Sequence, residues 1–136
     1  MVAVLKSLEI KKIRKYEPHG QIDIEYRNAN DINAVERIDI LHPYIKYIFG
    51  REGNIKPRNP RNTYISRKHL VIESTSLACK SCKRIARWFI QDLDSENGTA
   101  VNCELIGKDQ VFLEDGDVIS IPDTKYPMSE SFIFLQ

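Results

Sequence analysis

The chain has 136 residues with 20 basic and 19 acidic side chains, so its formal net charge is +1. Its length fits one domain over residues 1–136, and its 42% hydrophobic residues are enough for a buried core and exclude a chain disordered by composition. No apolar run approaches the roughly 20 residues of a membrane-spanning helix. We expect no secretory signal, because Lys6 interrupts the first apolar stretch, and three cysteines give no disulfide framework, which favours an intracellular compartment.

Short runs rich in β-branched and aromatic residues dominate the chain and predict strands. In chain order they cover residues 4–10, 21–26, 37–41, 44–50, 70–74, 87–93, 117–121 and 131–135. Turn-forming residues separate the later runs, at positions 96–98, 114–117 and 122–123. Many short strands separated in this way predict an all-β fold, either an antiparallel sandwich or a barrel.

The segment from Asp31 to Leu41 is ambiguous. Asp31 could cap a helix, and apolar residues at positions 32, 35 and 38 have helical spacing. The end of the segment, residues 37–41, alternates instead like a strand. Both interpretations remain open from the sequence.

Charge is unevenly distributed along the chain. Residues 51–69 carry six cations against one anion, and residues 92–117 carry eight acidic residues against one lysine. A general polyanion binder is usually basic overall, so the near-neutral net charge favours one local anion site. Nucleic-acid binding by the basic loop 51–68, with Tyr64 as a stacking platform, is the alternative that this pattern leaves open.

Three short segments carry the residue types that hold a phosphate group. Arg51 follows a glycine at the end of a strand-like run, where a guanidinium can make bidentate, charge-assisted hydrogen bonds to phosphate oxygens. Ser66 and Arg67 stand in a polar loop before the run 70–74. Asn97 and the glycine after it mark a tight turn that can aim the asparagine amide outward.

Two further motifs could indicate catalysis or metal binding, but the sequence supports neither. A hydrolase triad of Ser66, His69 and Asp92 needs the first two to converge, whereas strand residues three apart point to opposite faces, and no Gly-x-Ser-x-Gly elbow is present. Cys79 and Cys82 have zinc-ligand spacing, but no second such pair completes a site, so we expect no metal.

The motifs follow one another in a specific order: Gly-Arg at 50–51, Ser-x-x-His at 66–69, Asp-Leu-x-Ser-x-Asn-Gly-Thr-x-x-Asn at 92–102 and Asp-Gly-Asp at 115–117. With this order and spacing, from Phe49 to about Ile121, the chain resembles the forkhead-associated (FHA) domain, a phosphothreonine-binding module. The resemblance implies a two-sheet antiparallel β-sandwich with its binding loops at one end. It also implies a phosphothreonine-containing protein or peptide as partner, and neither catalysis nor a cofactor.

The resemblance assigns roles to residues of three kinds. Phosphate binding is implied for Arg51, Ser66 and Arg67, and binding of the surrounding peptide for Tyr64, Ser95, Glu96 and Asn97. Structural roles in shaping the loops are implied for Gly50, His69, Gly98, Thr99 and Asn102. The basic loop residues Arg58 and Arg61 would favour an acidic residue three places after the phosphothreonine.

One position departs from the family pattern. Serine or threonine often precedes the asparagine in FHA domains, whereas this chain has Glu96. A carboxylate close to a phosphate would repel it. Three outcomes remain open: Glu96 points to solvent, it lowers affinity as far as a degenerate pocket, or it selects a basic residue in the ligand.

The family also suggests a cellular setting. FHA domains occur in nuclear signalling proteins, often at the amino terminus of checkpoint-type serine/threonine kinases. The resemblance therefore implies a nuclear protein that is recruited to phosphorylated partners, with a fungal meiotic or DNA-damage checkpoint kinase as the parent. A phospho-dependent homodimer of the parent and a scaffold with a degenerate phosphate pocket are further alternatives.

Overall fold

The computed structural model of the chain describes residues 2–8, 10–16, 22–26, 37–57, 63–77, 85–122 and 130–136. Within these ranges the secondary structure consists of strands, without a helix. Accordingly, no helix in the described ranges is long and apolar enough to cross a membrane.

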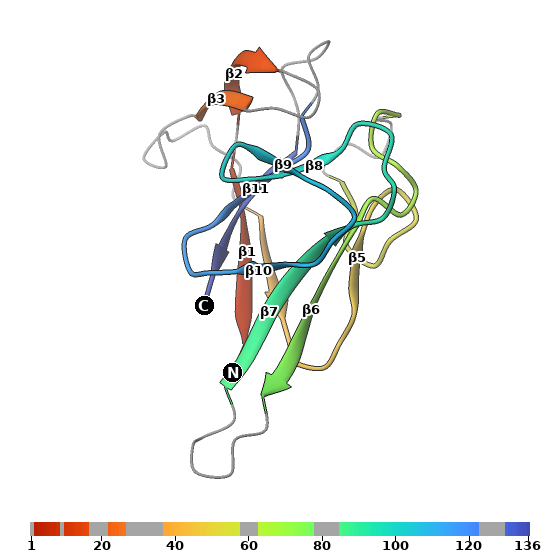
Figure 1. Cartoon of the computed structure of the whole chain (residues 1–136), viewed down its shortest axis with the longest axis vertical. Helices are drawn as coiled ribbons and strands as arrows, with labels where there is room; N and C mark the ends of the chain where they lie inside the picture. Colours follow the sequence, from red (N-terminus) through yellow and green to blue (C-terminus); the bar gives the residue numbers. More distant parts are fainter. Residues whose placement is uncertain are drawn as a thin grey trace.

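Two antiparallel sheets face one another as a sandwich (Figure 1). The six-stranded sheet has the order β4 (Ile38–Leu41), β1 (Ala3–Leu8), β12 (Ser131–Leu135), β11 (Val118–Ser120), β8 (Thr99–Val101) and β9 (Glu104–Ile106). The four-stranded sheet has the order β10 (Val111–Leu113), β7 (Ile85–Asp92), β6 (Leu70–Leu77) and β5 (Tyr47–Phe49). A separate two-stranded sheet pairs β2 (Ile10–Tyr16) with β3 (Ile22–Tyr26). The two-sheet antiparallel sandwich predicted from the family resemblance is confirmed.

The core lies between the two sheets and follows from the alternation of side chains along the strands. On β1 the inward residues, Leu5 among them, are buried, and the residues between them are half-buried. Aromatic pairs join the sheets across the core. The ring centroids of Phe49 (β5) and Phe132 (β12) are 5.2 Å apart in an edge-to-face arrangement, and those of Trp88 (β7) and Phe134 (β12) are 6.1 Å apart. Such pairs add about 0.5–1.5 kcal/mol to the free energy of burial.

The strand register places two loops at the same end of the sandwich. Phe49 pairs with Leu70, and Leu70 pairs with Asp92, so these three residues form one row across the four-stranded sheet. The chain leaves this row through the loop after β5 and the loop after β7, and it re-enters the row from residues 63–69. Figure 1 shows the loops side by side, on the upper right. All the segments with phosphate-binding motifs therefore meet at one end.

Each predicted strand run overlaps a strand of the structure, and the ambiguous segment ends in a strand. Ile38–Leu41 is β4, so a helix over the whole of 31–41 is wrong, and residues 31–36 lie outside the described ranges. The sequence missed β2, β8, β9 and β10. The last three have three residues each, too few to show a period of two.

Candidate functional site

The loop that follows β5 lies directly against the segment that precedes β6. The backbone N–H of Arg51 donates to Ser66 O at 3.2 Å, and that of Glu52 donates to Arg67 O at 2.9 Å. At Gly50 a Cβ atom would stand 2.2 Å from Arg67 O, a backbone atom that cannot swing aside. The glycine is therefore required by the close approach of the two segments.

The same contact orients the side chain of Arg51. Its Nε donates to the backbone carbonyl of Ile65 at 2.7 Å, while the residue itself is half-buried. Within the described residues its two terminal nitrogens have no partner, and they carry four of the five guanidinium N–H donors. An arginine fixed by its Nε and open at its far end is arranged to bind an anion in a bidentate manner.

Ser66 connects this loop to the loop after β7. Its Oγ accepts a hydrogen bond from the backbone N–H of Glu96 at 3.1 Å. Because the hydroxyl acts as an acceptor in this bond, its own proton remains available for a further acceptor. A phosphate oxygen is such an acceptor, and Ser66 neighbours Ile65, to which Arg51 is bound.

His69 holds the two loops together from beneath. The ring is fully buried; its Nδ1 accepts the backbone N–H of Ser66 at 3.1 Å, and its Nε2 is bonded to Gly98 O at 2.7 Å, which makes Nε2 the protonated nitrogen. Burial lowers the pKa of His69, against the opposing effects of the Gly98 carbonyl and the Asp92 charge. The neutral ring is therefore a structural brace between two backbone segments.

Asp92 shapes the second loop from its buried carboxylate. Ser95 donates to it twice, through its backbone N–H at 3.0 Å and its hydroxyl at 2.5 Å, and the Thr99 hydroxyl donates at 2.7 Å. Ser95 Oγ in turn accepts the N–H of Gly98 at 3.0 Å. This network closes the turn, so Ser95 and Thr99 support the loop from within.

Comparison with known proteins gives the family of this fold and site. The family model described as the FHA domain matches residues 47–122, more than half of the chain. The chain belongs to the FHA domain family. The family resemblance stated from the motifs is thereby confirmed, and the match includes both loops that form the site.

Solved structures of the same fold cover most of the chain. The FHA domain of an Arabidopsis thaliana hypothetical protein is 31% identical, with 73% of each chain covered and a TM-score of 0.54. Full-length yeast Pml1p is 23% identical and matches 97% of this chain and 81% of its own, with a TM-score of 0.61. The MEK1 FHA domain in complex with the HOP1 pThr318 peptide is 19% identical, with 96% and 94% covered and a TM-score of 0.56. A comparison with curated proteins finds no match.

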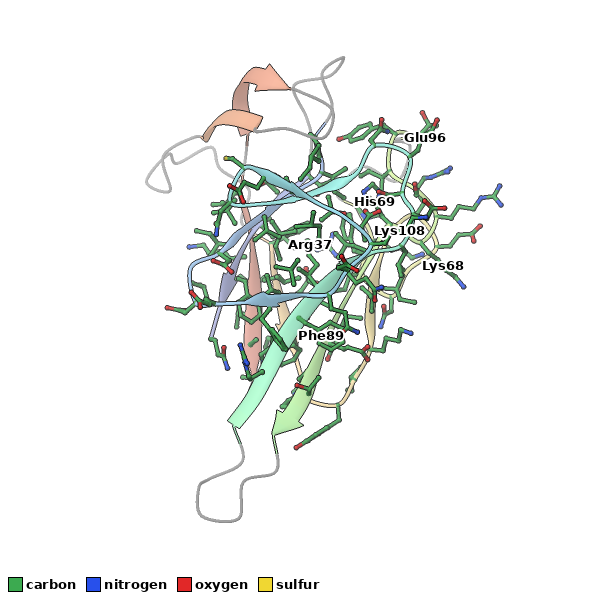
Figure 2. All side chains as sticks on the ribbon, viewed as in Figure 1. Arg37, Lys68, His69, Phe89, Glu96 and Lys108 are labelled. Atoms are coloured by element: carbon green, nitrogen blue, oxygen red, sulfur yellow. The ribbon has the colours of Figure 1, made fainter. Side chains whose placement is uncertain are left out.

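The exposed rim of this FHA domain carries charges of both signs. Arg67 lies 3.7 Å from Glu52, and both side chains are largely exposed, at 72% and 62%. Such a pair is weak, so Arg67 can turn to another anion at little cost. Glu96 is exposed, and Figure 2 shows it at the outer edge of the loop end, with Lys68 further along that edge. The side chain of Glu96 is therefore exposed to solvent, and its effect on affinity and on the choice of ligand stays a prediction.

Asn97 is oriented differently from the sequence expectation. Its Nδ2 donates to the backbone carbonyl of Tyr64 at 2.7 Å, which joins the two loops, instead of pointing away from the domain. The turn does not close a hairpin either, because β7 and β8 belong to different sheets. Gly98 supplies the positive φ, +85°, that the crossing requires.

The hydrolase triad is not formed. Ser66 Oγ is bonded to Glu96 N, both ring nitrogens of His69 are bonded to backbone atoms, and Asp92 is bonded to Ser95 and Thr99. Within the described residues, no group of three or more metal-ligating side chains is found either. Cys79 and Cys82 lie outside these residues.

Most of the residues that the resemblance selected lie together in the FHA loops. They are Gly50, Arg51, Tyr64, Ser66, Arg67, His69, Ser95, Glu96, Asn97 and Gly98, with Thr99 buried behind them. Asn102 lies elsewhere, in the β8–β9 turn, where it has a φ of +51° and binds Asp117 and the backbone of Val118. Arg58 and Arg61 are outside the described residues.

Two residues contribute to the site in ways that the motifs did not indicate. Asp92 begins the motif at 92–102 but was given no role in the site, although the Asp-x-x-Ser spacing is that of an aspartate that caps its own turn. Ile65 contributes its carbonyl to Arg51, and a backbone role of this kind leaves no sequence signal.

Proposed function

We propose that this FHA domain binds a phosphothreonine-containing segment of a partner protein and so recruits its parent protein to phosphorylated partners. Arg51, Ser66 and Arg67 bind the phosphate, and Asn97 with Tyr64 positions the peptide. The observation that carries the proposal is the Nε anchor of Arg51 on Ile65 O, because it fixes the guanidinium at the residue next to Ser66 and leaves its terminal nitrogens open.

The charges at the site support a doubly ionised ligand. A phosphate at neutral pH has about −1.5 to −2 charges and three strong acceptor oxygens. Arg51 and the exposed Arg67 offer positive charge, and Ser66 offers a neutral donor. An unphosphorylated threonine would leave these donors without acceptors. The MEK1 FHA domain, a neighbour in fold, is known in complex with a phosphothreonine peptide, which is consistent with this use of the loops.

The test is a fluorescence titration of the full chain against three matched degenerate peptide libraries, with phosphothreonine, phosphoserine or threonine at the fixed position. Binding only to the phosphothreonine library is expected, and Arg51→Ala should abolish it while the protein stays folded. Arg87→Ala is the matched control, because it removes an exposed arginine from β7, away from the loops. Retained affinity in a folded Arg51→Ala protein contradicts the proposal.

The wider setting that we propose is nuclear signalling, with a fungal checkpoint-type kinase as the parent protein. One neighbour in fold is consistent with a nuclear setting, since yeast Pml1 is described as a splicing factor that is integrated into the RES complex. Fluorescence microscopy of the tagged parent protein tests the location. Exclusion of the tagged protein from the nucleus would refute it, without bearing on phosphothreonine binding.

A further inference from the structure

A groove lies between the two sheets on the side of the sandwich formed by β9 and β10. Each is the last strand of its sheet, β9 in the six-stranded sheet and β10 in the four-stranded sheet. The space between them measures ≈ 450 Å³, within the range of roughly 300–1,000 Å³ that is typical of ligand sites. No residue of the phosphate-binding loops lines it.

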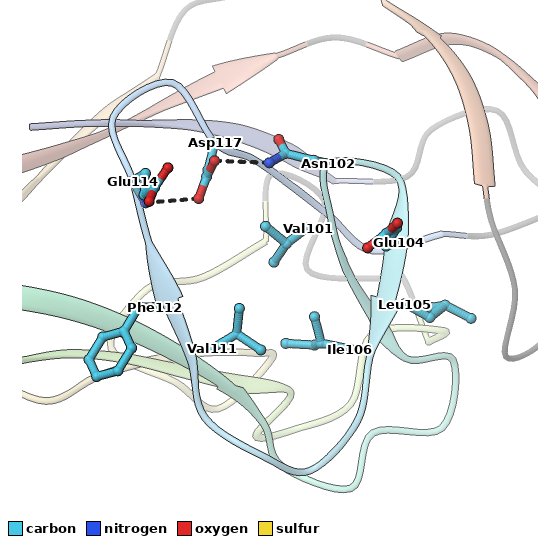
Figure 3. A pocket seen from close by; sticks show the side chains of 9 residues that line it. All are labelled: Val101, Asn102, Glu104, Leu105, Ile106, Val111, Phe112, Glu114 and Asp117. Atoms are coloured by element: carbon cyan, nitrogen blue, oxygen red, sulfur yellow. Dashed lines mark hydrogen bonds between the residues drawn. The ribbon is translucent and has the colours of Figure 1, made fainter.

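The inner part of the groove is apolar. Figure 3 shows Ile106 of β9 and Val111 of β10 pointing toward one another between the strands, with Val101 nearby. Val101 is buried, and the other two are half-buried. Together they form a surface on which an aliphatic chain can pack.

The outer part of the groove is acidic. Glu104, Glu114 and Asp117 line it, and Figure 3 shows Glu114 and Asp117 on one side of the space and Glu104 on the opposite side, on β9. The Asp117 carboxylate is fixed by Asn102 Nδ2 at 2.9 Å and by the backbone N–H of Glu114 at 2.8 Å. Within the described residues, neither glutamate side chain has a hydrogen bond or an ion pair. Three carboxylates without a cation produce a local negative potential.

The walls of the groove can also bind a backbone. An edge strand presents N–H and C=O groups on its free side, and an extended peptide can pair with them. Within the described residues, β9 pairs only with β8, and β10 pairs only with β7. The groove therefore has an apolar surface, carboxylates on both of its sides and unpaired strand edges.

We propose that this groove is a second docking site, for an extended segment of a partner protein that carries an arginine. The arginine stem packs on Val101, Ile106 and Val111, and its guanidinium reaches Glu104 and Glu114 beside Asp117. An arginine suits the groove because its side chain combines a long apolar stem with a planar head that binds carboxylates in a bidentate manner. The site is independent of phosphothreonine binding, since the two share no residue.

The test is an NMR titration of the ¹⁵N-labelled full chain with the peptide Ac-Thr-Val-Arg-Val-Thr-NH2. A second peptide has norleucine in place of the arginine, so that it keeps an unbranched aliphatic side chain but has no charge. The arginine peptide should shift the amide signals of residues 101–106 and 111–117 saturably, and the norleucine peptide should leave them unchanged. The double variant Glu104→Gln/Glu114→Gln should weaken binding at least tenfold. Its phosphothreonine-peptide affinity should stay within twofold of the unmodified chain.

The control is Asp94→Asn/Asp109→Asn. It also removes two negative charges, but from exposed positions that do not line the groove. It should change the affinity for the arginine peptide by less than twofold. An equal loss in both double variants would mean attraction to net charge alone and would overturn the proposal. Equal binding of the norleucine peptide, or shifts confined to other surfaces, would overturn it as well.

Discussion

The hydroxyl of Ser66 accepts the backbone N–H of Glu96 at 3.1 Å, although thirty positions separate the two residues. This hydrogen bond joins the loop before β6 to the loop after β7 at the point where the phosphate is proposed to lie. The side chain that binds the ligand is therefore the same side chain that sets the distance between the loops.

Replacement of Ser66 by alanine should weaken phosphothreonine-peptide binding more than it weakens the fold. A hydrogen bond to a charged group contributes about 1.5–3 kcal/mol, so Kd should rise by roughly ten- to a hundredfold. Loss of one half-buried hydrogen bond should cost about 1 kcal/mol of unfolding free energy. Isothermal titration calorimetry and urea unfolding measure the two effects. A Kd within twofold of the unmodified chain would remove Ser66 from the phosphate site.

Stability should fall as the pH falls, because of His69. Burial lowers its pKa in the folded state below the ordinary value of 6.5, so between these two values the unfolded chain binds more protons. The contribution is complete above pH 6.5 and is lost as the pH drops toward the lowered pKa, with a slope of at most about 1.4 kcal/mol per pH unit from this group.

Urea midpoints between pH 7.5 and pH 5 measure this slope. His69→Gln should be less stable at every pH but should lose its share of the slope, whereas His42→Gln, at an exposed position, should keep the full slope. An unchanged slope in His69→Gln would show that other groups cause the pH dependence.

Gly50→Ala should destabilise the domain, and Gly107→Ala should not. The added methyl at position 50 would overlap the Arg67 carbonyl and force the two loop segments apart, at a cost of about 1–3 kcal/mol by analogy with overpacking. At Gly107 an added Cβ meets nothing within 4 Å, and the effect should stay within about 0.5 kcal/mol. Thermal unfolding of the two variants in parallel gives the comparison, and similar melting temperatures would contradict the packing argument.

Glu96→Ser should raise the affinity for a phosphothreonine peptide severalfold at low salt. The carboxylate lies at the exposed edge of the site, where its repulsion of a phosphate is weakened but not abolished by solvent. The gain should shrink at high salt as screening increases. Glu104→Ser, at an exposed position outside the phosphate-binding loops, serves as the control. A lower affinity in Glu96→Ser would indicate instead that the glutamate contacts a basic residue of the ligand.

The sequence predicted the site better than it predicted the strands. Gly50, Arg51, Ser66, His69 and the turn from Ser95 to Gly98 stood out because their order and spacing are specific. The three-residue strands β8, β9 and β10 were missed, because their pairing depends on partners far along the chain and not on local periodicity.

The orientation of particular side chains could not be predicted from the sequence either. The Asn97 amide was expected to face outward, but it donates to Tyr64 O, a contact that exists only because Phe49, Leu70 and Asp92 align the two loops in one row. The Asp-x-x-Ser spacing indicates the bonds of Asp92 to Ser95, but its bond to Thr99 depends on the folded turn.

The frame of the site is fastened largely to main-chain atoms: Arg51 to Ile65 O, Asn97 to Tyr64 O, and His69 to Ser66 N and Gly98 O. Main-chain atoms do not change when a residue is substituted. The exposed side chain of Glu96 can therefore diverge among descendants of this domain without a compensating change in the frame, whereas Ile65 is held by its burial in the core. The preference for residues around the phosphothreonine can therefore change while the contacts that position Arg51, His69 and Asn97 stay the same.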